Sequence, residues 1–153
     1  MTVDKAIHYY CNYQERCHQE VRNKLYELGC NKTEVEEYIS DLVSSGIINE
    51  ERYARAYARG KFKMKQWGKN KIKQQLKLKK ISEYCIKKGL SEIDNGEYLK
   101  VLKKQSEKKW KELKGEKRMP IKKSKLYHYL LQKGYEYDLI EEIIKELIIN
   151  ENV

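Results

Sequence analysis

Proline, phenylalanine and long apolar runs are scarce in this sequence. It has one Pro, one Phe and eight Gly in 153 residues, against 13 Tyr. So few turn-forming residues, together with many Lys, Glu, Leu and Ile, favour helices over strands joined by tight turns. No run approaches the ~20 apolar residues that a membrane-spanning helix needs, so we expect no membrane partner.

The cysteines and histidines lack the spacing of a metal or redox site. Cys11, Cys17, Cys30 and Cys85 include no pair separated by two residues, as in a zinc knuckle. Cys17 and the adjacent His18 have no further ligand at a useful spacing. The first ten residues also lack the apolar segment of a secretory signal. We therefore expect reduced cysteines, no bound metal and a cytoplasmic location.

Catalytic motifs are missing as well. The Gly68–Lys69 pair lacks the first Gly and the Ser or Thr of a phosphate-binding loop. His8, His18 and His128 do not have the spacing of a zinc-protease helix, and no Ser lies in a nucleophile-elbow motif. We expect a protein that is not an enzyme and that has no catalytic residue and no cofactor.

Acidic residues are absent from one long segment. The formal net charge is +10, but residues 1–50 carry −4, residues 51–125 carry +18 and residues 126–153 carry −4. Between Arg52 and Ser82 there are 12 basic residues and no acidic one. These like charges repel one another, and a folded protein tolerates that repulsion more readily when a partner neutralises the charges. The pattern predicts a polyanionic partner, for which a phosphate backbone and an acidic protein surface both fit.

The expected contact residues lie in this basic segment. Three arginines at spacings of three and four lie along one stripe of a helix, beside Tyr53 and Tyr57, which would face the core. Trp67 is either a packing residue or a base-stacking residue. No base-reading module is evident, so sequence-specific recognition is not expected. A solvated charged surface is the alternative to the contact residues that we predict: Arg52, Arg55, Arg59, Lys69, Lys71 and Lys73.

An internal repeat recurs at intervals of 51 and 54 residues. Each copy has a leucine followed four residues later by an expected helix end, and the anchors are Leu25, Leu76 and Leu130. Gly29 and Gly134 suit the left-handed residue that closes many helices. Lys80 does not, so we expect the middle turn to differ. The matching apolar positions are Val21/Ile72/Leu126, Val35/Ile86/Ile140, Ile39/Leu90/Ile144 and Leu42/Ile93/Leu147.

Each copy thus predicts two amphipathic helices, and a further helix precedes each pair. The additional helices are expected over roughly Val3–Tyr13, Glu50–Lys65 and Glu97–Leu113. The predicted fold is all-α, with three tandem three-helix modules in an elongated arrangement. The modules are 1–47, the basic module 48–93, and 94–153. A single helical bundle with accidental self-similarity is the alternative.

Four groups of residues resemble motifs of the RecX family, in the family's order. The most extensive runs from Ile48 to Arg59 and has the acidic helix start followed by Tyr-Ala, with Asn49 where the family usually has Asp. Lys80 stands where the family often has Gly. The other groups are Gly68, Lys69, Ile72, Leu76 and Ile81; Arg16, Glu20, Val21, Lys24, Leu25 and Gly29; and Leu130, Lys133, Gly134, Tyr135 and Ile140.

The resemblance spans nearly the whole chain, and it implies a function. RecX-type proteins bind RecA filaments on DNA, lie in the filament's helical groove, and inhibit or modulate RecA ATPase and strand exchange in recombination, DNA repair and the SOS response. The implied partners are the RecA recombinase filament and single- or double-stranded DNA. We also expect a monomer, since no heptad pattern predicts a coiled-coil dimer. The alternatives are a general nucleic-acid-binding helical module without recombinase contact, and a helical scaffold for an acidic protein.

Overall fold

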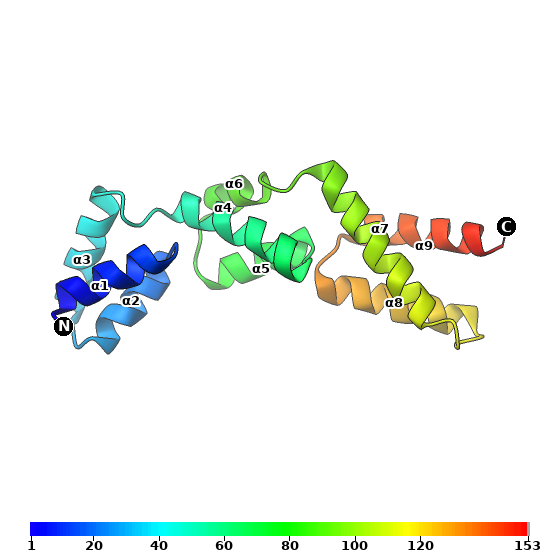
Figure 1. Cartoon of the computed structure of the whole chain (residues 1–153), viewed down its shortest axis with the longest axis horizontal. Helices are drawn as coiled ribbons and strands as arrows, with labels where there is room; N and C mark the ends of the chain where they lie inside the picture. Colours follow the sequence, from blue (N-terminus) through cyan, green and yellow to red (C-terminus); the bar gives the residue numbers. More distant parts are fainter. Residues whose placement is uncertain (153) are drawn as a thin grey trace. The chain divides into compact units, whose positions relative to one another are not determined.

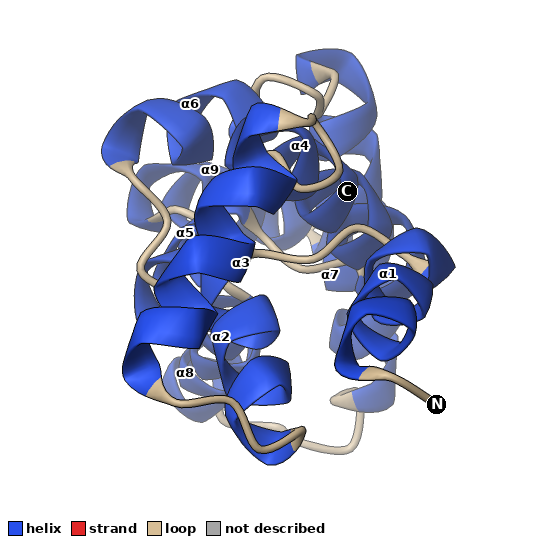
Figure 2. Ribbon diagram, turned by 90° about the vertical axis from the view of Figure 1, so that its left-hand side faces the viewer, coloured by secondary structure: helices blue, strands red, loops and turns tan. Residues whose placement is uncertain are grey.

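The structure is a computed structural model that describes residues 1–152. Within that span the chain forms helices and connecting loops and no strand (Figure 2), which confirms the all-α prediction. The elements follow one another along the chain as Figure 1 labels them. They are α1 (Val3–Tyr13), α2 (His18–Glu27), α3 (Lys32–Ser44), α4 (Glu50–Gly60), a π-helical segment (Lys61–Lys65), α5 (Lys69–Leu78), α6 (Glu83–Leu90), α7 (Asn95–Glu112), α8 (Met119–Lys133) and α9 (Tyr137–Glu151).

The described residues form two compact units. Unit 1 contains Met1–Ala58 and Gln75–Glu92, and unit 2 contains Arg59–Gln74 and the described residues from Ile93 onward. Helices α4 and α5 each contribute residues to both units. The expected module boundaries and the elongated arrangement stay predictions. None of the helices in the described part of the chain is long and apolar enough to cross a membrane.

Unit 1 has a core built from one face each of α1, α2 and α3, which lie together in Figure 1. Thr2 begins α1, where its hydroxyl accepts a hydrogen bond from Lys5 N, and Asn31 begins α3 in the same way through Glu34 N. The apolar positions predicted from the repeat are buried here. The core residues are Ile7, Cys11, Val21, Leu25, Cys30, Val35, Ile39, Leu42 and Ile48.

Unit 2 has α7, α8 and α9 packed side by side (Figure 1). Their shared core contains the third copy of the repeat, with Leu126, Leu130 and Ile140 fully buried. Lys122 of α8 is buried, and its ammonium lies 3.9 Å from the Trp110 ring centroid. Its Nζ is 3.3 Å from a carboxylate oxygen of Glu151, so the buried charge has a partner.

The three helix-closing turns of the repeat have one geometry. Gly29, Lys80 and Gly134 all have positive φ, at 95°, 61° and 98°. In each turn this residue donates to the carbonyl three residues earlier, and the next residue donates to the carbonyl five residues earlier. The expectation that the turn at Lys80 differs is therefore wrong. Its hydrogen bonds, such as Lys80 N to Lys77 O at 2.9 Å, hold lysine in a conformation that glycine adopts more easily.

The helix expected over Glu50–Lys65 has two parts. The α-helix ends at Gly60, and a wider π-turn continues it through Lys61–Lys65. Phe62 is buried in this turn, with its ring 5.8 Å from that of Tyr98. The segment ends at Gln66, which has a left-handed φ of 57°. Helix periodicity alone does not reveal this change of hydrogen-bond register.

Candidate nucleic-acid interface

Arg52 anchors the start of α4 within unit 1. Its Nε lies 2.6 Å from a carboxylate oxygen of Glu15. The two terminal nitrogens donate to the carbonyls of Gly46 at 3.2 Å and Ile47 at 3.0 Å. The side chain is still about half exposed. Arg52 thus joins α4 to the loop before it, and a partner's phosphate would compete with the Glu15 carboxylate.

Arg55 is held between two carboxylates. Its Nη1 lies 3.1 Å from Glu92 and its Nε lies 3.2 Å from Glu51. Hydrogen bonds to Glu92 and then Glu51 raise the pKa of the Arg55 guanidinium. Two acids around one arginine leave this part of α4 with little positive charge to offer a polyanion. Sequence spacing did not reveal the pairing, because Glu92 is 37 residues away.

The two tyrosines expected to pack beside these arginines do so to different extents. Tyr53 is buried, and Tyr57 is partly buried, with the ring centroids 5.8 Å apart. Burial is the main cause of the raised pKa of Tyr53. The predicted packing role of Tyr53 is confirmed. Arg59, the third expected arginine, is exposed in the last turn of α4 and belongs to unit 2.

The three expected lysines lie in the first half of α5, in unit 2. Lys69 Nζ is 3.0 Å from the side-chain oxygen of Asn95 and 4.7 Å from the Tyr98 ring centroid. Lys71 Nζ is 4.7 Å from the Trp67 ring centroid, and Lys73 is exposed. Among residues 1–152, none of these three lysines has an ion pair with a carboxylate. These three lysines therefore carry positive charge that no carboxylate of the described residues pairs with, and their contact role stays a prediction.

The turn before α5 is fastened to the turn between α8 and α9. Gly68 N donates to the Lys133 carbonyl at 2.7 Å, and Asn70 N donates to the Gly134 carbonyl at 2.9 Å. The Tyr135 hydroxyl donates to the Gln66 carbonyl at 2.8 Å. Within unit 2, these bonds fix the backbone on both sides of Trp67. The sequence marks both glycines but does not show that they lie together.

Tyr98 makes a second set of hydrogen bonds that hold the start of α5 in place, and these bonds were not predicted from the sequence. Its hydroxyl accepts a hydrogen bond from Lys69 N at 2.9 Å and donates one to Glu136. The ring is buried and lies 5.4 Å from that of Tyr135. Burial, followed by the bond to Glu136, raises the pKa of the Tyr98 hydroxyl. This phenol therefore fixes the start of α5 against α7 and the residue before α9.

Trp67 has two lysine ammonium groups near its ring. The ammonium groups of Lys61 and Lys71 are 5.1 Å and 4.7 Å from the ring centroid. Trp67 is partly buried, whereas Trp110 is 8% exposed and donates its Nε1 hydrogen to Glu151 at 2.9 Å. Trp110 is thus a packing residue, whereas Trp67 is partly exposed beside two cations.

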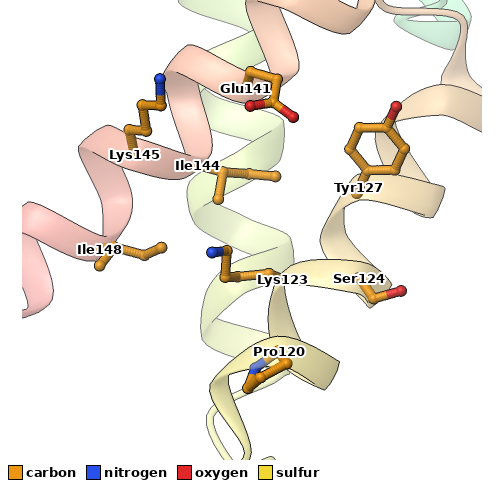
Figure 3. A pocket seen from close by; sticks show the side chains of 8 residues that line it. All are labelled: Pro120, Lys123, Ser124, Tyr127, Glu141, Ile144, Lys145 and Ile148. Carbon is orange, nitrogen blue, oxygen red and sulfur yellow. The ribbon is translucent and has the colours of Figure 1, made fainter.

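The described residues also include buried cysteines and a groove outside the basic segment. No group of three or more potential metal ligands occurs within the described residues. Cys11, Cys17 and Cys30 are buried free thiols, with pKa values raised by burial. A groove of about 300 Å³ runs between α8 and α9 (Figure 3), and none of its lining residues belongs to the basic segment. It is lined by Pro120, Lys123, Ser124, Tyr127, Glu141, Ile144, Lys145 and Ile148.

Comparisons with known proteins agree on one family. Residues 49–90 match the family model for the second three-helix domain of RecX, and residues 96–144 match the model for its third three-helix domain. Together the two matches cover more than half of the chain. Both fall on helices that the structure contains, α4 to α6 and α7 to α9.

Individual relatives support the same family. The chain is 36% identical over 134 residues to the regulatory protein RecX of Clostridium perfringens (strain 13 / Type A), covering 87% of this chain and 62% of that protein. It is 32% identical over 131 residues to the regulatory protein RecX of Clostridium botulinum (strain Eklund 17B / Type B), covering 85% and 61%. The chain therefore spans about three fifths of the length of these relatives.

A solved structure is similar over nearly its whole length. The crystal structure of RecX from Lactobacillus salivarius matches with a TM-score of 0.82 and 28% identity. The match covers 95% of this chain and 94% of that one. The order of helices found here is thus shared with an experimentally determined protein.

Proposed function

Because this chain belongs to the RecX family, we propose that it is a regulatory protein that binds RecA filaments on DNA and lowers their ATP hydrolysis and strand exchange. The observation that carries the proposal is the similarity, over 87% of the chain, to a protein named regulatory protein RecX. Lys69, Lys71 and Lys73 of α5 support it, because they have no ion pair with a carboxylate of the described residues and offer positive charge to a DNA phosphate backbone or an acidic protein surface.

The lysines of unit 2 are the principal contact residues in this proposal. No carboxylate within the described residues pairs with Lys69, Lys71 or Lys73. A polyanion can therefore interact with the full positive charge of these lysines. Arg52 and Arg55 would first have to share or release their carboxylates, as Arg52 is 2.6 Å from Glu15. They are therefore secondary contacts, and Arg59 adds to the lysines as an exposed residue of the same unit.

Several modest contacts on linked modules would give high avidity without any one strong site. The modules proposed from the repeat are 1–47, 48–93 and 94–153. Once one module is bound, the next binds intramolecularly at high effective concentration. The protein then acts by binding alone, as a monomer, without catalysis, cofactor or metal.

Filament binding can be tested by cosedimentation with RecA assembled on single-stranded DNA. The protein is expected to pellet with filaments at a salt concentration where it no longer binds bare DNA. Equal binding to both would support the general nucleic-acid-binding module and contradict a recombinase regulator. Binding to RecA that survives nuclease treatment would place the contact on acidic protein surface.

A charge-reversal variant locates the contact. Lys69→Glu/Lys71→Glu/Lys73→Glu should weaken filament binding at least tenfold while helicity by circular dichroism is retained. The matched control is Lys104→Glu/Lys108→Glu/Lys111→Glu, which makes the same charge change at exposed lysines of α7. Equal losses in the two variants would mean that net charge, rather than this segment, decides binding. Arg55 is left unchanged, since Glu there would place three carboxylates together.

A further inference from the structure

Trp67 follows two consecutive irregularities of the backbone. The π-turn of Lys61–Lys65 comes first, and then Gln66 with a φ of 57°. Segments of π-helix and non-glycine residues with positive φ persist where surrounding contacts fix them, and both are frequent at functional sites. Trp67 thus lies between the end of the π-turn and the start of α5, and the exposed Lys65 lies two residues before it.

The backbone of this segment is fixed before any partner binds. The Gln66 carbonyl accepts from the Tyr135 hydroxyl, and the Gly68 amide donates to the Lys133 carbonyl. The side chain of Gln66 also bonds to that of Gln105, which in turn accepts from the Tyr129 hydroxyl. A preorganised contact residue loses less conformational entropy when it binds a ligand.

The chemistry around the ring combines an aromatic face with cations. The ammonium groups of Lys61 and Lys71 lie within about 5 Å of the centroid. The indole N–H has no acceptor anywhere in the described residues, and Trp67 is partly exposed. Lys63 and Lys65 are exposed next to it in the chain. A nucleotide complements this set, since its base has a π-face and its phosphates accept from ammonium groups.

We propose that Trp67 stacks on one base of single-stranded DNA while Lys61 and Lys71 bind the phosphates on either side of that base. The inference rests on the proposed function, because it names the DNA strand and the residues that hold it. A base within a duplex is already covered on both faces by its neighbours, so the site selects an unpaired strand. Stacking on a base is stronger than an exposed lysine–ring contact, so the ammonium groups leave the ring for phosphate.

Tryptophan fluorescence reports this contact directly. The sequence has two tryptophans, so Trp110→Phe leaves Trp67 as the sole tryptophan, and excitation at the red edge of tryptophan absorption avoids the 13 tyrosines. We expect (dT)20 to quench the emission of this variant and to protect it from acrylamide, and a 20-base-pair duplex to do neither at equal occupancy. Unchanged Trp67 emission at (dT)20 concentrations that saturate binding by anisotropy would overturn the proposal.

Affinity for labelled (dT)20 gives a second test in the otherwise unaltered chain. Trp67→Ala should weaken binding by roughly five- to a hundredfold, the range found for loss of one base–aromatic stack, and Trp67→Phe should weaken it less. The matched control is Tyr84→Ala. Tyr84 is 62% exposed and has the Lys88 ammonium 5.5 Å from its ring, but α6 holds it without a π-turn. Equal losses for Trp67→Ala and Tyr84→Ala would contradict a dedicated site.

Base stacking by Trp67 and regulation of RecA can be tested independently of each other. The fluorescence and anisotropy experiments contain no RecA, so they test stacking alone. If (dT)20 leaves Trp67 unaffected but the protein still lowers RecA ATPase, the stacking site is wrong and the regulatory function stands. If (dT)20 quenches Trp67 but RecA ATPase is unchanged, the stacking site stands and the regulatory function is wrong.

Discussion

Gly68 is packed against the backbone of Gly134 so closely that a Cβ at position 68 would overlap the Gly134 carbonyl group. The approach is possible because neither residue has a side chain, and it lets Asn70 N reach the Gly134 carbonyl at 2.9 Å. Within unit 2 this contact joins the start of the basic helix α5 to the turn between α8 and α9. The stability of unit 2 and the position of Trp67 therefore depend on two residues 66 positions apart.

Gly134→Ala should be far more damaging than Gly29→Ala. Both glycines have a φ near 95°, so an alanine at either position costs about 1–2 kcal/mol of conformational energy. A Cβ at Gly134 would also overlap Lys71, whereas a Cβ at Gly29 meets nothing within 4 Å. We expect Gly134→Ala to lower the free energy of unfolding by about 2 kcal/mol more than Gly29→Ala, measured by urea denaturation. Equal losses would show that the close approach is unimportant for stability.

Lys80→Gly is expected to stabilise the chain. Lysine at a φ of 61° is strained by about 1–2 kcal/mol, while glycine loses about 0.5–1 kcal/mol more in chain entropy on folding. The net gain is about 0.5 kcal/mol, seen as a small rise in Tm. Lys77→Gly, inside α5, removes the same side chain from a regular helix and should lower stability by about 1 kcal/mol. A lower Tm for Lys80→Gly would mean that its side chain stabilises the turn.

Tyr98→Phe tests the hydrogen bonds at the start of α5. The change keeps the ring but leaves Lys69 N and the Glu136 carboxylate without the phenol that joins them. Loss of a partly buried hydrogen bond with its partners left unpaired costs about 1–3 kcal/mol. Chemical denaturation should show that loss. Tyr127→Phe is the control, because the Tyr127 ring packs edge-on against Tyr137 and no hydroxyl bond would be lost within the described residues. An unchanged unfolding curve for Tyr98→Phe would contradict the fastening role.

The salt dependence of DNA binding distinguishes the lysines from the paired arginines. Each phosphate contact contributes about 0.7–0.9 to the slope of log K against log salt concentration. Lys69→Gln/Lys71→Gln/Lys73→Gln should therefore reduce the slope by about 2–3. Arg55→Gln should change it little, because Glu51 and Glu92 already neutralise Arg55. A larger change for Arg55→Gln than for the lysine variant would reverse this assignment of contacts.

The repeated core could be predicted from the sequence because burial follows the helical period. Leu25, Leu76 and Leu130 are all fully buried, as the aligned repeats predicted. The geometry of the turn at Lys80 could not be predicted from the sequence. Residue type favours a φ only statistically, whereas the hydrogen bonds of the turn determine the φ that Lys80 adopts. The pairing of Arg55 with Glu92 depends on folding over 37 residues, and spacing along one helix does not show it.

The composition of the sequence reveals the basic segment. It does not reveal which of the basic residues lack a carboxylate partner in the folded protein. The sequence shows 12 cations between Arg52 and Ser82, and the structure shows which of them already have carboxylate partners. The fastening of Trp67 through Gln66 and Gly68 likewise joins residues far apart in the chain. Long-range polar contacts of this kind have no local sequence signal.

The proposed regulation of RecA can be measured as the rate of ATP hydrolysis by RecA on single-stranded DNA. We expect the wild-type protein, at concentrations no higher than that of RecA, to lower this rate. The Lys69→Glu/Lys71→Glu/Lys73→Glu variant should leave the rate near its value without added protein, while the α7 lysine control should still lower it. An unchanged rate at saturating wild-type protein would contradict the claim that this chain regulates RecA.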